Sequence, residues 1–107
     1  MIAHGLPIYV ALEPVDMRLG AERLGALVRE RMRTEPRSRA LFVFVGKRPT
    51  RVKVLWWERN GYCLLYKRLH RALFRLPPSA AGAASVRIDG AGLAALLGGV
   101  ENPHARS

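Results

Sequence analysis

The sequence predicts a single domain with an α/β fold of the α+β type, in which a mainly antiparallel sheet is built around a central β-hairpin and packed by two helices. The length of 107 residues suits one domain of the usual size, about 100–200 residues. The dipeptide Asn60-Gly61 separates two strand-like runs and is the strongest short hairpin signal. Apolar residues recur at helical spacing in two other segments. We therefore expect one domain over residues 1–107, with residues 102–107 as a frayed tail.

The predicted strands are short runs of β-prone residues. Residues 8–12 form the first, and a Glu-Pro dipeptide ends it because proline cannot continue a central ladder. Residues 41–45 are wholly apolar, which is typical of a strand buried on both faces. Turn-forming residues follow at 46–50, and a short strand is expected at 85–88, after a loop of small residues.

The two predicted helices each follow an aspartate. Asp16 precedes the helical pattern of residues 17–33, and Asp89 precedes the pattern of residues 90–98. Aspartate is a favoured N-cap because its carboxylate accepts hydrogen bonds from the first free N–H groups of a helix. For the first helix an alternative stays open, in which Asp16 and Arg18 form a local charge-assisted contact at the corner between strand and helix.

The hairpin pattern predicts one apolar and one mixed face. A two-residue loop at Asn60-Gly61 places Arg59 opposite Tyr62, and successive side chains then alternate between the two faces. The mixed face, expected to point to solvent, carries Arg51, Lys53, Leu55, Trp57 and Arg59 opposite His70, Arg68, Tyr66, Leu64 and Tyr62. A three-residue loop with a bulge is the alternative, and it would shift the register by one and spread the charges over both faces.

The charge distribution favours a polyanionic partner. The chain has 18 Lys and Arg against 8 Asp and Glu, a formal net charge of +10. The basic excess lies between Arg37 and Arg75, where Glu58 is the only acid. Cations neutralise phosphates, and aromatic rings stack bases at about 1–3 kcal/mol each. We therefore predict a nucleic-acid-binding surface made of Lys47, Arg48, Arg51, Lys53, Trp57, Arg59, Tyr62, Tyr66 and Arg68.

The sequence offers no group for catalysis, metal binding or a cofactor. The acids are scattered, and Gly46-Lys47 lacks the earlier glycine of a phosphate-binding loop, since that position is Leu41. The single cysteine, Cys63, excludes an internal disulfide and is expected to be a packed thiol. The three histidines lie far apart and make no zinc spacing. We expect a non-enzymatic protein without cofactor or metal.

The expected location is the cytoplasm. The first residues lack the charged and apolar regions of a signal peptide, and a single cysteine fits a reducing compartment. The longest apolar stretch, residues 91–100, has about half the length of a membrane span. We expect no membrane association.

The chain resembles the TnpB-type accessory proteins encoded by the second open reading frame of the IS66 group of bacterial insertion sequences. The strongest matching stretch is Arg-Val-Lys-Val-Leu-Trp-Trp at residues 51–57, continued by residues 60–69. Further matches are residues 8–11, 15–20, 41–44 and 74–77, and the closing segment with Leu93, Leu96, Leu97, Gly99 and Val100. The Ala-rich loop at residues 78–84 carries no family signature. The resemblance implies a role in transposition beside a separate, larger DDE transposase, and it supplies no catalytic residues.

Two functional hypotheses follow. In the first, the protein is a non-enzymatic accessory factor that binds nucleic acid, with the DNA of the transposon ends as the expected ligand. In the second, it is an adapter that docks on the transposase, with Trp57 and Tyr66 as anchors, because aromatic residues dominate interface hot spots. A small enzyme would need a pocket with perturbed acids, for which the sequence offers no candidate. DNA or RNA as ligand, sequence preference and oligomeric state stay open.

Overall fold

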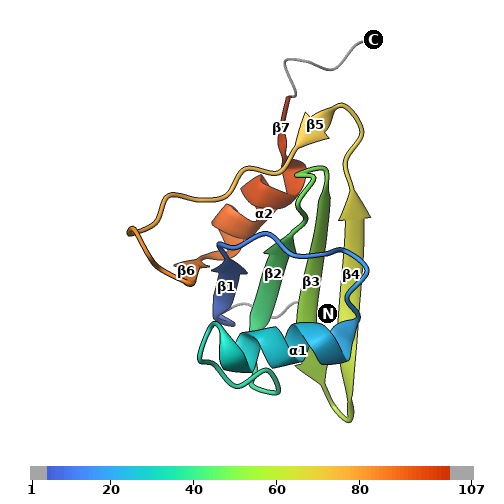
Figure 1. Cartoon of the computed structure of the whole chain (residues 1–107), viewed down its shortest axis with the longest axis vertical. Helices are drawn as coiled ribbons and strands as arrows, with labels where there is room; N and C mark the ends of the chain where they lie inside the picture. Colours follow the sequence, from blue (N-terminus) through green and yellow to red (C-terminus); the bar gives the residue numbers. More distant parts are fainter. Residues whose placement is uncertain (1–4, 102–107) are drawn as a thin grey trace.

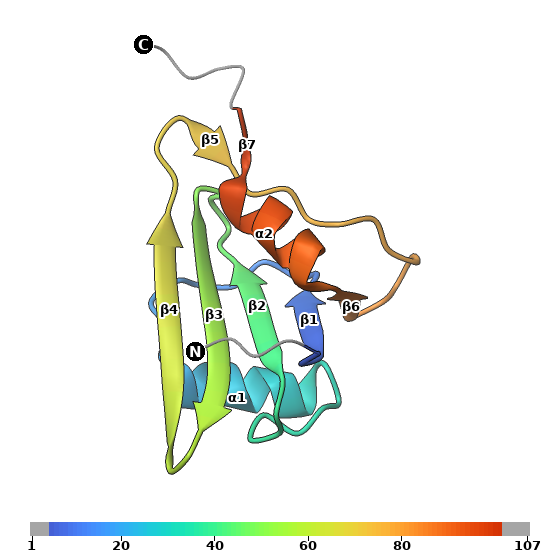
Figure 2. The same ribbon diagram turned by 180° about the vertical axis from the view of Figure 1, so that it is seen from behind.

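The computed structural model describes residues 5–101 and confirms an α+β fold. A five-stranded sheet lies between two helices, one on each face (Figures 1 and 2). The elements are β1 (Ile8–Ala11), α1 (Ala21–Glu30), β2 (Leu41–Val45), β3 (Arg51–Glu58), β4 (Gly61–Arg68), β5 (Ala72–Leu73), β6 (Ser85–Ile88), α2 (Gly90–Gly98) and β7 (Val100–Glu101). The expected tail at 102–107 lies outside the described residues.

The sheet has the strand order β4-β3-β2-β1-β6. Strands β1 and β2 are parallel and connected through α1, whereas the other neighbouring pairs are antiparallel. The hairpin of β3 and β4 therefore forms one side of the sheet, and β2 occupies the centre. Strands β5 and β7 form a small separate pair that the sequence did not predict.

Each face of the sheet packs against one helix through its own apolar cluster. On the face covered by α1 (the α1 face), Leu24 and Val28 pack with Phe42, Phe44 and the fully buried Leu55. The face covered by α2 (the α2 face) has its own cluster, formed by Ile8, Val10, Leu41, Val43, Val45, Val52, Val54, Phe74, Leu93 and Leu96. All five residues of β2 are buried, which confirms the prediction of a strand covered on both faces.

The first helix is shorter than predicted, and Asp16 does not cap it. Gly20 occupies the N-cap position with extended backbone and no side-chain cap, so α1 begins at Ala21 instead of residue 17. The N–H of Val15 donates to the carbonyl of Val45 at 3.0 Å, which holds the preceding segment on the sheet. The alternative contact is present, since Arg18 donates to both carboxylate oxygens of Asp16. By contrast, Asp89 caps α2 as predicted, accepting from the N–H of Gly92 at 2.7 Å.

The hairpin turn lies one residue earlier than predicted. Trp57 faces Tyr62 and Glu58 faces Gly61, so the two loop residues are Arg59 and Asn60. The register therefore differs by two positions, which leaves every side chain on its predicted face. Arg59 adopts a positive φ of 57°, a conformation that costs a non-glycine residue about 1–2 kcal/mol. Packing of Tyr62 against Trp57 and α1 fixes this register against the local turn preference.

A close approach of Tyr62 to α1 leads to a testable prediction. A Cβ atom added at Gly25 would lie 2.7 Å from the Tyr62 hydroxyl oxygen. We expect Gly25→Ala to lower the free energy of unfolding by about 1–3 kcal/mol, because the ring must move away from the helix. In a Tyr62→Phe background the hydroxyl is gone and the cost should fall below about 1 kcal/mol. Urea denaturation of the four proteins in this cycle measures the difference, and equal costs in both backgrounds would contradict the contact.

Candidate nucleic-acid interface

A basic groove opens on the α1 face of the sheet, beside the end of the hairpin that is remote from the β3–β4 turn. The segment between β1 and α1 crosses the sheet (Figure 1). Residues of this segment line one side of the groove, and residues of β3 and β4 line the other. The groove has a volume of about 650 Å³. It is lined by Val15, Asp16, Met17, Arg18, Lys47, Arg48, Arg51, Lys53, Leu64 and Tyr66.

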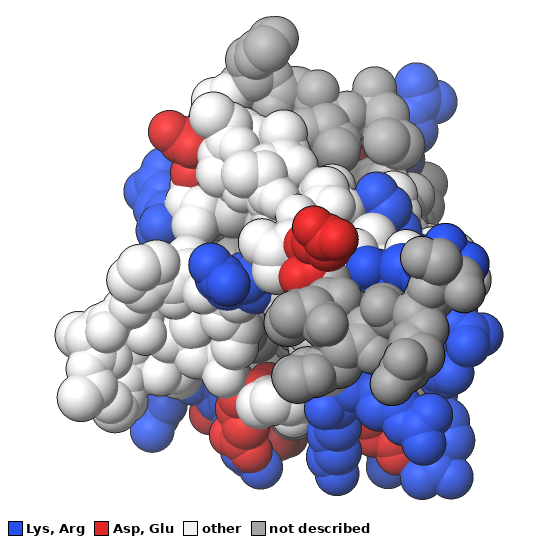
Figure 3. Space-filling model, turned by 90° about the horizontal axis from the view of Figure 1, so that it is seen from above, with Lys and Arg blue, Asp and Glu red and all other residues white. Residues whose placement is uncertain are grey.

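The groove unites five of the nine residues that the sequence proposed for nucleic-acid binding. Lys47 and Arg48 come from the β2–β3 turn and are exposed, and Arg51 and Lys53 come from β3. Tyr66 comes from β4 and is 51% exposed. Arg68 does not line the groove, but it is exposed and lies opposite the groove residue Arg51 in the ladder. Seen from above, Lys and Arg side chains crowd the side of the molecule formed by β3 and β4, whereas the side toward the loop before β6 is mostly uncharged (Figure 3).

The other three predicted residues lie near the opposite end of the hairpin. The edge of Trp57 meets the ring of Tyr62, with 5.0 Å between centroids, and the guanidinium of Arg37 lies 4.6 Å from the Trp57 centroid. Tyr62 is half-buried beside α1, and Arg59 is an exposed turn residue. The expectation that the whole mixed face points to solvent is therefore wrong. Helix α1 covers the part of this face that lies near the β3–β4 turn, because the apolar side of the helix packs against Leu55.

The structure adds Arg18 and Leu64 to the groove, neither of which the sequence proposed as a site residue. Arg18 arrives through the corner between β1 and α1, where it donates to Asp16. The pattern Asp16-Met17-Arg18 could have signalled only the local ion pair. The corner and the hairpin are far apart in the chain, so the sequence does not show that they lie close together in space. The side-chain alternation of the hairpin assigned Leu64 to the correct face, but a leucine side chain has no chemical feature that marks a nucleic-acid-binding site.

Most groove cations have no acidic partner. Among residues 5–101, ion pairs join Arg18 with Asp16, Arg29 with Glu35, and Arg31 with Glu13, and only the first lies in the groove. The Lys53 ammonium donates one hydrogen bond to the Leu19 carbonyl at 2.8 Å, and it lies 5.6 Å from the Tyr66 ring centroid. Lys53 therefore fixes the crossing segment to β3 and retains a positive charge in the groove.

The single acid of the groove stays ionised under ordinary conditions. The pKa of Asp16 is lowered from 3.8 to about 2, mainly by hydrogen bonds from the side chain and the backbone N–H of Arg18, with a smaller contribution from the charge of Lys47. The same pairing raises the pKa of Arg18. Asp16 and Arg18 therefore remain an ion pair over the whole neutral range.

This lowered pKa predicts how the corner responds to acid. A folded-state pKa below the unfolded value contributes stability that is complete above about pH 4 and is lost as the pH falls toward 2. We expect the difference in unfolding free energy between the wild type and Asp16→Asn to be constant from pH 7 to about pH 5 and to shrink between about pH 4 and 2. Denaturant unfolding over this pH series measures it. A difference that is independent of pH would contradict the pairing.

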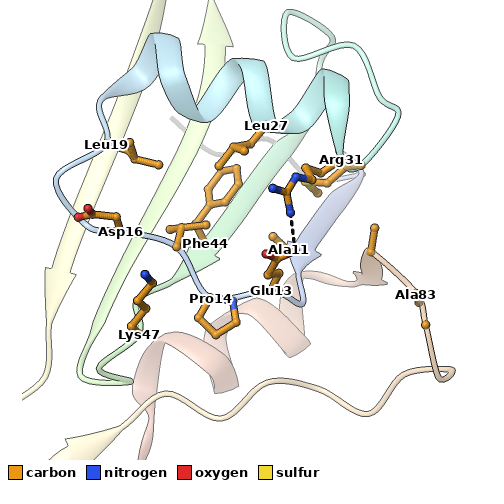
Figure 4. A pocket seen from close by; sticks show the side chains of 14 residues that line it. Ala11, Glu13, Pro14, Asp16, Leu19, Leu27, Arg31, Phe44, Lys47 and Ala83 are labelled. Atoms are coloured by element: carbon orange, nitrogen blue, oxygen red, sulfur yellow. Dashed lines mark hydrogen bonds and ion pairs between the residues drawn. The ribbon is translucent and has the colours of Figure 1, made fainter.

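A second, more apolar cavity lies next to the basic groove, and residues 14–16 form the wall between them. It has a volume of about 460 Å³ and lies between the crossing segment, the C-terminal half of α1 and the loop before β6. Figure 4 shows Leu19, Leu27 and Phe44 toward its floor, and the ion pair of Arg31 with Glu13, 2.7 Å long, at its rim. Lys47 lines both cavities.

The described residues give no indication of a metal site or a membrane span. In residues 5–101, histidine, cysteine and acidic side chains do not gather in groups of three or more. Cys63 was expected to be a packed thiol, but it is only half-buried, and its sulfur lies 3.9 Å from a carboxylate oxygen of Glu58. His70 is exposed, whereas His4 and His104 lie outside the described residues. Neither α1 nor α2 has the length and hydropathy to cross a bilayer.

Comparison with known proteins identifies the family. The family model described as "IS66 Orf2 like protein" matches residues 6–107. The chain belongs to this family. The IS66 Orf2-like assignment confirms the resemblance seen in the sequence, and it makes the protein an accessory protein of an insertion sequence.

Two relatives are uncharacterised proteins of Sinorhizobium fredii. The protein y4hO is 36% identical over 97 residues, which are 91% of this chain and 83% of y4hO. The protein y4jC is 38% identical over 81 residues, 76% of this chain and 69% of y4jC. No solved structure matches the chain.

Proposed function

We propose that this IS66 Orf2-like protein is a non-enzymatic accessory factor for transposition that binds DNA of its insertion sequence through the basic groove. The single observation that carries the proposal is the gathering of five cations and one exposed aromatic ring, with one acid, in an open groove. These cations come from two turns and a strand that are separated in the sequence.

The groove has the chemistry that a nucleic-acid backbone requires. Lys47 and Arg48 are exposed on a turn, where a phosphate can approach without displacing other side chains. Arginine binds phosphate with two parallel N–H donors, and lysine acts as a point charge. The exposed ring of Tyr66 lies between these cations and the sheet edge, where an unpaired base could stack on it.

The salt dependence of binding tests this proposal. If the groove and Arg68 neutralise about five phosphates, the slope of log K against log salt on duplex DNA should be about −4. Fluorescence anisotropy with labelled transposon-end duplex and with a scrambled duplex of equal length measures the slope and the sequence preference. A single-stranded DNA and an RNA of the same sequence show which form is the ligand. Binding that is absent at low salt, or independent of salt, would overturn the proposal.

A second candidate function is an adapter that docks on the transposase, and the apolar cavity beside the groove favours it. Its apolar floor would accept a side chain of the partner, and Lys47 at the shared wall would attract an adjacent carboxylate. Trp57, one of the two anchors expected from the sequence, is instead held between Arg37 and Tyr62.

Filling this cavity separates the two functions. We expect Ala83→Trp to abolish capture of the purified transposase of the same element if the cavity is the docking site, because the indole occupies the space for the anchor. Ala80→Trp, an exposed position on the same loop that does not line the cavity, is the matched control. Capture that is equal with both variants would exclude docking in this cavity, and DNA binding should be retained by both.

A further inference from the structure

The strand β4 is an open edge of the sheet. It has eight residues, and its outer side has no strand partner in the described part of the chain. Such an edge presents a row of free N–H and C=O groups that can pair with another strand, and natural proteins protect edges with charges or cover them. Here the cations of β4 are confined to its last two residues, Lys67 and Arg68, and Lys67 is directed toward α2, where it donates to the Leu97 carbonyl at 2.8 Å.

The exposed apolar side chains of the molecule lie on this same strand. Among residues 5–101, the large hydrophobic side chains with substantial exposure are Leu64 at 36% and Tyr66 at 51%. Both are on the α1 face of β4, two residues apart. An apolar stripe beside a free strand edge is a feature of surfaces that associate.

We propose that β4 pairs antiparallel with β4 of a second copy of this chain, about a two-fold axis through Leu64, and forms a continuous ten-stranded sheet. A self-complementary pairing of one edge is the geometry of a two-fold dimer. In an antiparallel ladder, the two residues of a pair both point their N–H and C=O groups toward the partner strand, or both point them away. Neighbouring residues of one strand point these groups in opposite directions. The two-fold axis must therefore pass through a residue of β4 and not between two residues.

The side chains select Leu64 as the axial residue. In this register Leu64 contacts Leu64 of the second copy, and Tyr66 lies opposite Tyr62, which are favourable cross-strand pairs. An axis through Cys63 would instead pair only residues 61–65 of β4, and it would leave Tyr66 beyond the ladder. The Leu64 axis pairs residues 61–67, so it gives the longer ladder together with the apolar pairs of Leu64 and Tyr66.

The position of Lys67 is compatible with the same register. With the axis at Leu64, Lys67 of the second copy faces Gly61, which has no side chain. Lys67 keeps its hydrogen bond to the Leu97 carbonyl of its own copy, so the ladder brings no two cations face to face. The remaining repulsion is between two chains of net charge +10, and salt screens it.

The dimer would present both α1 faces, and therefore both basic grooves, on one side of the extended sheet. This inference does not depend on nucleic-acid binding, since it rests on the edge and its side chains. Pairing through one eight-residue edge buries less surface than a standard interface of about 1,600 Å². We therefore expect a dissociation constant of the dimer in about the micromolar range. Dimerisation should strengthen with added salt, whereas DNA binding should weaken.

Sedimentation equilibrium of the purified protein, without nucleic acid, tests the proposal at low and high salt over a range of concentrations. We expect a monomer–dimer equilibrium that shifts to the dimer at high salt. Leu64→Lys places two ammonium groups at the axis and should leave only monomer. Ala94→Lys adds the same charge at an exposed position on α2 and should still dimerise. A monomer under all conditions, or a dimer that survives Leu64→Lys, would overturn the proposal.

Cross-linking tests the register independently of affinity. In a Cys63→Ser background, Leu64→Cys should form a disulfide-linked dimer under oxidised glutathione, because a residue on the axis lies within about 4.5–5.5 Å of its copy. Leu65→Cys in the same background should not, since the axis lies one residue away. Rapid cross-linking at residue 65 and none at 64 would show a different register. If β4 pairs only with a strand of another protein, neither cysteine variant would form a cross-linked dimer, and the proposal would be wrong.

Discussion

Reversing two charges at the mouth of the basic groove should weaken DNA binding about 100-fold at low salt. In Lys47→Glu with Arg48→Glu, two phosphate contacts are lost, each worth about 1.5 kcal/mol as a charge-assisted hydrogen bond. Both side chains are exposed on the β2–β3 turn, so the change should not affect the fold. The slope of log K against log salt should fall from about −4 to about −2, because each lost contact removes about one unit. Anisotropy titrations with duplex DNA measure both quantities.

The matched control changes the net charge by the same amount elsewhere. Arg23 on α1 and Arg87 on β6 are exposed and do not line the groove. Arg23→Glu with Arg87→Glu should keep the slope at about −4, since the phosphate contacts are intact. If both double variants lose affinity equally, the attraction comes from the overall charge of the chain, and the groove is not the binding site.

The glycine after α2 should be the most sensitive small residue of the fold. Gly99 has φ 72° and ψ −179°, a region that only glycine occupies without strain. A Cβ atom there would lie 2.5 Å from Leu69 Cδ1 and 2.9 Å from the Leu73 carbonyl oxygen. Backbone strain and collision together should cost about 3 kcal/mol in Gly99→Ala, and the melting temperature should fall by roughly 15 °C.

The preceding glycine supplies the control for this prediction. Gly98 lies in the last turn of α2, and an added Cβ atom would have no neighbour within 4 Å. Gly98→Ala should be neutral or stabilise the helix by up to about 1 kcal/mol, because alanine has the higher helix propensity. Circular dichroism melts of the two alanine variants compare adjacent positions of the same chemistry. A similar loss of stability in both would contradict a special role of Gly99, which turns the chain from α2 into the β5–β7 pair.

The partial cover by α1 changes how the hairpin can be used. From the sequence, one continuous solvent-facing surface would carry nine binding residues. The helix divides that surface into a basic groove at one end and a packed cluster of Trp57, Tyr62 and Arg37 at the other. A nucleic acid in the groove would meet Tyr66 as its aromatic contact. The rings of the packed cluster instead stabilise the hairpin against α1.

The sequence by itself determined the features that depend on local chemistry. The apolar run of residues 41–45 predicted a doubly covered strand, Asp89 predicted a capped second helix, and the family resemblance matched nearly the whole chain. The alternation of the hairpin also assigned each side chain to the correct face, because a register difference of two positions preserves that alternation.

Only the tertiary structure decided which of those side chains stay accessible. No local pattern tells where α1 lies on the sheet, since its position depends on long-range packing of Leu24 and Val28 against Leu55 and the two phenylalanines of β2. The contacts of Tyr62 with Trp57 and α1 accompany the turn at Arg59 and Asn60, and the segment that crosses the sheet brings Arg18 to the groove from a distant corner. Side-chain alternation is set by neighbouring residues, whereas burial and the meeting of distant cations are set by contacts between elements that are far apart in the chain.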